Sequence, residues 1–171
     1  MKQLKKLFVL TLLLISFAGI SAAQERESKS RKEIRAERQQ KRIDEVQELI
    51  EKGNFVFKAT HALPMGGGSI QLDFSYDAEL RNDTIVSFLP FFGVAYRVDY
   101  GGRNSAFDFT LPVENMEINK VKDGYRVSFD VKNKMDYLNY NFNISEPGYA
   151  TLNIISTNRQ AISYYGSIEA P

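Results

Sequence analysis

The stretch YRVSFDVKNKMDYLNYNFNI, residues 125–144, alternates apolar and polar side chains on both sides of a short interruption. A period of two is typical of a β-strand with one buried and one solvated face. The pattern predicts two strands that present Phe129 and Phe142 to a shared interior and Arg126 and Asn143 to solvent. It decides the fold class, because the same period recurs through most of the chain.

Similar runs predict roughly ten strands in all. They lie at residues 55–60, 70–76, 84–89, 94–100, 107–111, 115–121, 125–131, 138–144, 149–157 and 161–168. Short turn sequences rich in Gly, Asn and Asp separate them, which favours antiparallel neighbours. We therefore expect an all-β domain over residues 53–171: a single antiparallel meander curled into a lipocalin-like barrel or folded over as a sandwich.

One charged N-terminal helix is expected before this domain, at residues 24–52. The segment holds strong helix formers with no Gly or Pro, and Gly53 ends it. An apolar stripe in its second half, which includes Val46 and Ile50, predicts docking on the domain. The first half is basic and lacks an apolar face, so it is either a solvated arm or a contact for an anionic lipid headgroup or acidic envelope polymer.

Residues 1–23 have the organisation of a signal peptide. Lys2, Lys5 and Lys6 precede an apolar run, and Ser21-Ala22-Ala23 supplies small residues for cleavage. The alternative, an uncut anchor, would need a longer apolar run. We expect a periplasmic or cell-surface protein with no integral membrane segment after cleavage.

Composition excludes several classes of function. The chain of 171 residues has no cysteine, so disulfides, thiolate metal sites and cysteine nucleophiles are excluded. Removal of Lys2, Lys5 and Lys6 takes the formal net charge from +1 to −2, which gives no general attraction to nucleic acid. We expect no nucleic-acid partner and no cofactor. The sequence indicates no particular oligomeric state.

Three stretches resemble a known family: Leu89-Pro90-Phe91-Phe92-Gly93-Val94-Ala95-Tyr96, Gly148-Tyr149-Ala150-Thr151-Leu152 and Ser163-Tyr164-Tyr165-Gly166-Ser167-Ile168. They are similar to an uncharacterised envelope family of Bacteroidetes-type bacteria, filed as domain of unknown function 4251. The resemblance spans residues 53–168 and implies an export route and a fold, but no reaction. Many members look like lipoproteins, whereas this chain has no cysteine to lipidate.

The candidate ligand site is an apolar barrel interior. Aromatic side chains on successive predicted strands would line it, together with two from the Pro90–Gly93 bend. The residues are Phe57, Phe74, Phe91, Phe92, Tyr96 and Phe109. The bend itself reads either as a platform for an apolar ligand at the barrel rim or as a corner plugged by aromatic rings.

Catalytic equipment is sparse, and we assign no catalytic and no metal-binding residue. His61 is the only histidine, and Asp73 and Asp77 fall on the solvated face of a predicted strand. Tyr137, Tyr140, Tyr149, Tyr164 and Tyr165 are read mainly as core, although exposed tyrosines stack on sugars or peptides.

Three functions follow from these observations. The leading hypothesis is a non-enzymatic envelope protein that binds a small apolar or amphipathic ligand. The alternative is an interaction or structural protein whose envelope partner contacts the charged helix or a sheet edge. A hydrolase that uses His61 and Asp73 is the least favoured.

Overall fold

The computed structural model describes residues 30–97, 107–134 and 136–171. Within them lie one helix, α2 (Arg31–Glu51), and nine strands. The strands are β1 (Phe55–Pro64), β2 (Ile70–Gln71), β3 (Asp77–Arg81), β4 (Thr84–Leu89), β5 (Phe107–Val121), β6 (Gly124–Asn133), β7 (Asp136–Ser145), β8 (Tyr149–Ser156) and β9 (Ile162–Glu169). The expected signal peptide at residues 1–23 lies outside the described residues.

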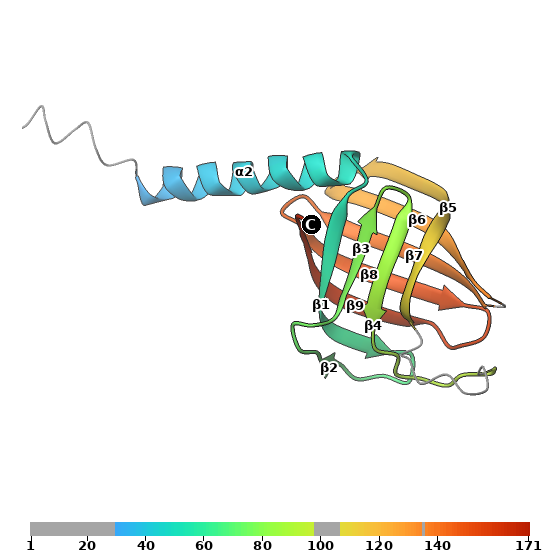
Figure 1. Cartoon of the computed structure of the whole chain (residues 1–171). Helices are drawn as coiled ribbons and strands as arrows, with labels where there is room; N and C mark the ends of the chain where they lie inside the picture. Colours follow the sequence, from blue (N-terminus) through green and yellow to red (C-terminus); the bar gives the residue numbers. More distant parts are fainter. Residues whose placement is uncertain (1–29, 98–106, 135) are drawn as a thin grey trace, which may run out of the picture. The chain divides into compact units, whose positions relative to one another are not determined.

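The strands form a closed antiparallel barrel. Each of β3–β9 pairs with its neighbour in chain order, and β1 pairs with both β3 and β9, which closes a barrel of eight strands (Figure 1). β2 pairs only with β1. The predicted antiparallel meander with a preceding helix is confirmed, and the chain forms the barrel rather than the sandwich.

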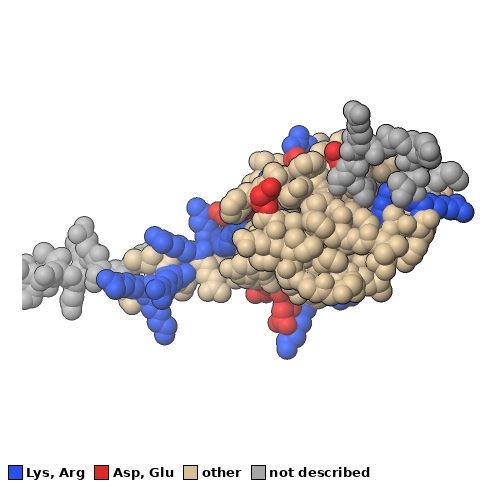
Figure 2. Space-filling view, turned by 90° about the horizontal axis from the view of Figure 1, so that it is seen from below, with Lys and Arg blue, Asp and Glu red and all other residues tan. Residues whose placement is uncertain are grey.

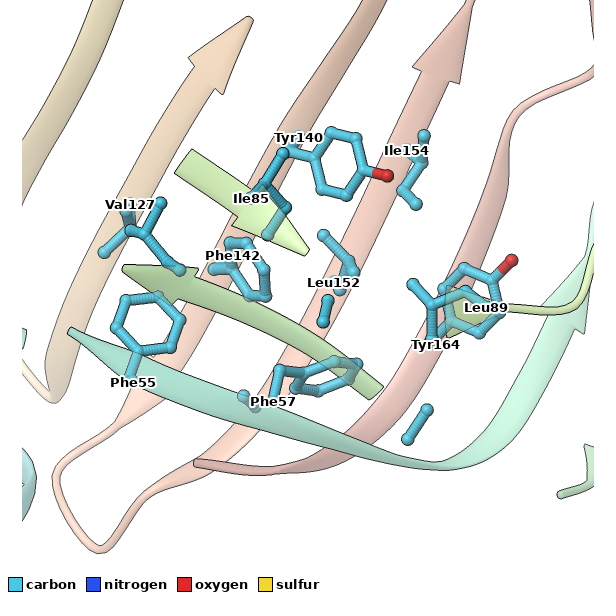
Figure 3. Packing of buried hydrophobic residues seen from close by; sticks show 14 of the residues in the cluster. Phe55, Phe57, Ile85, Leu89, Val127, Tyr140, Phe142, Leu152, Ile154 and Tyr164 are labelled. Atoms are coloured by element: carbon cyan, nitrogen blue, oxygen red, sulfur yellow. The ribbon is translucent and has the colours of Figure 1, made fainter. Parts of the chain in front are cut away.

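Side chains fill the barrel interior. Phe55 and Phe57 meet Phe142 edge to face, with ring centroids 5.5 and 5.6 Å apart (Figure 3). Phe129 stacks on Tyr140 at 5.2 Å. A barrel of eight strands either is filled by its own side chains or holds one small ligand, and here the buried aromatic rings fill it. The largest fully buried side chains are Tyr140, Tyr164, Phe55, Phe57, Phe107, Phe129 and Phe142.

The few polar groups inside the barrel are hydrogen-bonded. Tyr140 Oη lies 3.2 Å from Ser87 Oγ, and Tyr164 Oη donates to the Pro90 carbonyl oxygen at 2.7 Å. Among the described residues, no buried side-chain nitrogen or oxygen lacks a partner. The tyrosines therefore add aromatic bulk to the core without an unpaired hydroxyl.

The chain divides into two compact units, Met1–Gln40 and Lys41–Pro171, so the division falls inside α2. In the second unit Val46 and Ile50 are fully buried in the barrel core. Arg42 Nε donates to the Pro147 carbonyl at 3.3 Å, and Arg42 Nη2 to the Ile168 carbonyl at 2.5 Å. The predicted docking of the second half of the helix is confirmed. The domain boundaries at Ala23 and Gly53 stay predictions.

In the first unit, every side chain from Arg31 to Gln40 is exposed. Glu33 accepts a hydrogen bond from the Ser30 N–H at 2.9 Å, while the Ser30 hydroxyl accepts one from the Lys32 N–H at 3.3 Å. These reciprocal bonds make Ser30 the N-cap of α2.

No helix in the described part of the chain is long and apolar enough to span a membrane.

The predicted strand at residues 70–76 is wrong beyond Gln71. The Asp73 carboxylate accepts hydrogen bonds from the Ser75 N–H at 3.0 Å and from the Ser75 hydroxyl. Such local side-chain bonds compete with a strand ladder and turn the chain. Phe74 stands at this turn with 94% of its surface exposed, so it is not part of the interior.

The predicted strand at residues 94–100 is not formed in its described part, residues 94–97; the remainder lies outside the described residues. Ala95 makes an isolated bridge with Arg159, and the Tyr96 N–H donates to the Asn158 carbonyl at 2.7 Å. Tyr96 is 65% exposed and does not face the interior. These contacts with the turn after β8 hold residues 94–97 outside the barrel wall.

Two further strands differ from expectation. β3 was not predicted, because its sequence Asp-Ala-Glu-Leu-Arg offers only Ala78 and Leu80 as apolar signals. The separate strands expected at residues 107–111 and 115–121 are one strand, β5, with an irregular register between Glu114 and Glu117. Asn115 has a φ of 53° at this irregularity, which is a bulge that carries the strand onward.

Candidate functional site

The structure does not bring the predicted ligand-binding residues together around an open lumen. Phe57 is fully buried, whereas Phe74 and Tyr96 point to solvent. Phe109 is half-buried and packs against the core. Because Phe57 lies in the core while Phe74 and Tyr96 lie outside it, these residues do not share one site, and the candidate site lies elsewhere.

The Pro90–Gly93 bend packs against the barrel core. Phe91 meets the buried Phe107 edge to face at 5.7 Å, and Phe92 packs against the same core. Tyr164 anchors the bend through the Pro90 carbonyl. Of the two interpretations, the plugged corner describes this geometry.

Two long segments around this bend and β2 carry no charged residue. Residues 62–72 and 84–96 contain no Asp, Glu, Lys or Arg. Figure 2, which views the molecule from the side of β2, shows a broad surface free of charged side chains. Met65 and Val94, one from each of these segments, are exposed apolar residues.

The outward side chains of β7, β8 and β9 from Tyr137 to Ser167 form a second uncharged surface, which we call the outer face; the exposed Glu169 lies beyond it at the end of β9. Burial alternates along each strand, so every second residue points away from the core. None of these outward residues is charged between Tyr137 and Ser167. They are Tyr137, Asn139, Asn141, Asn143, Ser145, Tyr149, Thr151, Asn153, Ile155, Ser163, Tyr165 and Ser167.

A groove of about 720 Å³ lies at one end of the outer face. Strand pairing places Asn143 beside Thr151 and Thr151 beside Tyr165 in one row across the sheet. Tyr149 pairs with Ser167, so it is the diagonal neighbour of Tyr165, at a separation of roughly 8 Å. Thr60 of β1 and the hairpin at residues 121–123 complete the lining.

The groove is hollow because small residues lie between its two tyrosines. Tyr149 and Tyr165 are 72% and 50% exposed, while Ala150, Thr151 and Gly166 lie between them. Gly166 is required here, since a Cβ at this position would lie 1.9 Å from the Lys58 carbonyl oxygen across the β1–β9 seam. Two raised rings therefore stand over a low floor.

Hydrogen bonds hold the amide side chains of the outer face in place. Asn153 Nδ2 donates to Ser163 Oγ at 2.9 Å, and Arg126 Nε donates to Asn143 Oδ1 at 3.2 Å. Asn141 donates to Asn139. An amide has two N–H donors and two lone pairs on oxygen, so each asparagine keeps capacity for a ligand.

A second hollow, of about 420 Å³, lies at the other end of the outer face. Asp130 accepts hydrogen bonds there from Asn115 Nδ2 at 3.0 Å and from Asn139 Nδ2 at 2.8 Å. These donors hold the pKa of the Asp130 carboxyl below its usual range. Tyr137, 54% exposed, lines the same hollow.

The residues considered for hydrolysis do not form a catalytic arrangement in the described structure. His61 Nδ1 lies 3.1 Å from Thr60 Oγ1, on the outward side of β1. The hydrogen bonds from Ser75 lower the pKa of Asp73, which favours its ionised form over a proton donor. Within the described residues, no three His, Cys, Asp or Glu side chains gather as metal ligands.

Sequence reasoning missed the outer face as a site. The alternation correctly placed Asn139, Asn141 and Asn143 in solvent, and the exposed tyrosines were noted as a cluster. The cluster divides in the structure: Tyr140 and Tyr164 are core, whereas Tyr137, Tyr149 and Tyr165 are exposed. The alternation along each strand already separates the inward from the outward tyrosines. The absence of charged residues among the outward positions was the sequence signal for this surface.

Comparison with known proteins supports one family. A family model described as a domain of unknown function (DUF4251) matches residues 37–168. The crystal structure of a DUF4251 family protein from Bacteroides eggerthii DSM 20697 has a similar fold, with a TM-score of 0.57 and 16% sequence identity over 75% of this chain and 87% of that chain. No curated protein matches the chain.

Proposed function

Because the chain belongs to the DUF4251 family, whose description names no activity, we propose its function from the geometry of the barrel. It is an exported, non-enzymatic binding protein of the bacterial envelope, and it holds its ligand on the outer face. The observation that carries this proposal is the groove between Tyr149 and Tyr165. Raised aromatic rings over a low floor of small residues are typical of a binding surface rather than of a merely solvated strand.

Export is supported by the sequence of residues 1–23. We expect cleavage after Ala23, which gives a mature protein that begins at Gln24. Fractionation of the native cells followed by N-terminal sequencing checks this. Full-length protein in the inner membrane would contradict it and favour the uncut anchor.

A second candidate function uses the helix. Between Arg31 and Lys41, five basic side chains stand against Glu33 and Glu37, and all are exposed. This stretch supports an interaction with an anionic envelope component. It is independent of the outer face, so substitutions in the groove would leave it intact.

The test is chemical-shift mapping on isotopically labelled residues 24–171. The probes are a neutral hexasaccharide, a lysophospholipid and a short uncharged peptide. We expect at least one probe to shift the amide signals of Tyr149, Thr151 and Tyr165. Tyr149→Ala and Tyr165→Ala should weaken that binding, whereas Phe74→Ala, which removes an even more exposed ring away from the groove, should not.

Two results would overturn the proposal. One is that no probe shifts the groove signals. The other is that shifts gather on buried residues such as Phe57 and Phe142, which would restore the predicted interior site.

A further inference from the structure

We propose that the ligand of the outer face is a neutral oligosaccharide, bound across β7, β8 and β9 with sugar rings against the exposed tyrosines. This inference rests on the proposed binding function and names its ligand class. The observation that carries it is the juxtaposition of exposed tyrosines with an uncharged row of amides and hydroxyls on three adjacent strands.

The absence of charge limits the ligand. One quarter of the residues in the chain are charged, yet none of the outward residues of β7, β8 and β9 between Tyr137 and Ser167 is. Lys122 and Asp123, the charged residues that line the groove, are of opposite sign and adjacent in one hairpin. Within β7, β8 and β9 this stretch therefore offers an ionic ligand no counter-charge. The neighbouring charges on β6, Arg126 and Asp130, are each already hydrogen-bonded to an asparagine of the outer face.

The polar groups match sugar hydroxyls. A sugar hydroxyl both donates and accepts, and the side chains of Asn, Ser and Thr do the same. Asn141 and Asn153 lie beside each other in the register of β7 and β8, and Ser163 continues the row on β9. The bond from Asn153 to Ser163 sets the orientation of both groups before a ligand arrives, which lowers the ordering cost of binding.

The tyrosines supply the apolar component. A tyrosine ring packs against the C–H face of a sugar, and its hydroxyl reaches a polar neighbour. Tyr149 and Tyr165 stand at one end of the outer face, and Tyr137 stands at the other, with Lys132 Nζ 5.5 Å from its ring centroid. From Tyr137 to Asn143 along β7 is about 20 Å, which suits an oligosaccharide rather than one sugar.

Two other ligand classes fit less well. A lipid tail needs a continuous apolar lining, whereas the row of Asn141, Asn153 and Ser163 beyond the groove is polar. A peptide that adds a strand needs a free sheet edge, but β8 pairs with β7 on one side and with β9 on the other. Because the backbone groups of these strands are already paired, a ligand on the outer face is recognised by side chains.

The experiment is isothermal titration of residues 24–171 with maltohexaose, cellohexaose and N-acetylchitohexaose, followed by shift mapping of any that bind. We expect one of them to bind and to shift Asn143, Thr151 and Tyr165. Tyr149→Ala and Tyr165→Ala should each weaken binding at least about tenfold. Asn153→Asp, which adds a charge with little change of shape, should also weaken it.

The control variants are Phe74→Ala and Thr110→Ala, which change exposed side chains away from the outer face. Thermal unfolding of each variant shows that the barrel is intact. Groove shifts caused by the peptide or lysophospholipid but by none of the sugars would overturn the glycan inference and leave the proposed function standing. Sugar binding unaffected by both tyrosine variants would also overturn it. If no probe of any class reached the groove, both proposals would fall.

Discussion

Two tyrosine hydroxyls lie deep in the barrel, and their ionisation is linked to folding. Tyr140 is stacked on Phe129 and hydrogen-bonded to Ser87, while Tyr164 bonds to the Pro90 carbonyl. Burial raises the pKa of both hydroxyls well above the ordinary value of about 10. Each can lose its proton only where water solvates the charge, which means in the unfolded chain.

This linkage predicts a loss of stability in alkali. Above a pH of about 10 the unfolded tyrosines lose protons while Tyr140 and Tyr164 keep theirs, so the free energy of unfolding falls as pH rises. Each contributes up to about 1.4 kcal/mol per pH unit to that slope. Urea denaturation between pH 9 and 11 should show a shallower slope in Tyr140→Phe, with Tyr137→Phe as control for removal of a hydroxyl. Equal slopes in wild type and Tyr140→Phe would contradict it.

Single residues also show where alternation fails as a predictor. Phe74 fits the apolar parity of its run, yet the bonds between Asp73 and Ser75 turn the chain and expose the ring. The competing signal was in the sequence, because Asp two residues before Ser is a turn pattern. The prediction followed the hydrophobic period instead of this turn pattern, because a hydrophobic pattern does not report local hydrogen bonds.

At the scale of elements, one carboxylate joins β7 to the turn after β8. Asp136 is almost fully buried and accepts hydrogen bonds from Ser156 Oγ at 2.8 Å, Thr157 Oγ1 at 3.0 Å and the Asn158 N–H at 3.2 Å. Arg159 Nη1 adds an ion pair at 2.5 Å. The same turn carries the bridge to Ala95, so Asp136 also holds the segment outside the barrel wall.

Removal of this carboxylate should be costly. Asp136→Ala leaves Arg159 and several donors unpaired in a largely buried position, and we expect a loss of roughly 3 kcal/mol. Asp77→Ala is the control, because its pair with Lys58 is partly exposed and should be worth less than about 1 kcal/mol. Urea denaturation measures both. Similar losses for the two variants would show that the turn does not depend on Asp136.

The elements themselves were predictable to different degrees. β6 and β7 followed from strict alternation over long runs, whereas β8 and β9 were predicted from less regular runs. β3 was missed because Asp77, Glu79 and Arg81 hide a strand whose inward residues are only Ala78 and Leu80. The continuity of β5 could not be predicted, since a bulge at Asn115 shifts the parity midway.

At the scale of the barrel, the sequence predicted a shared dry interior but not whether that interior was open. The alternation in the sequence shows how many aromatic residues point inward. The volume that these residues must fill depends on how many strands close the barrel, which the alternation does not show. Closure of eight strands leaves room for the side chains or for one small ligand, and the size of the inward side chains decides that the interior is core here. The concavity of the outer face likewise depends on which side chains closure brings together, as Thr151, Gly166 and Thr60 are from three strands.

The C-terminal end of α2 is part of this core, so it is not a detachable arm. Ile50 is fully buried in the barrel, whereas Ile34 of the same helix is 37% exposed. We expect Ile50→Ala to lower the free energy of unfolding by about 2–5 kcal/mol, because the cavity opens in the barrel core, and Ile34→Ala to change it by less than about 0.5 kcal/mol. Urea denaturation of both variants checks this. If Ile50→Ala cost no more than Ile34→Ala, residues 41–51 would not stabilise the barrel, and the unit would begin at Gly53 as the change in sequence period predicts.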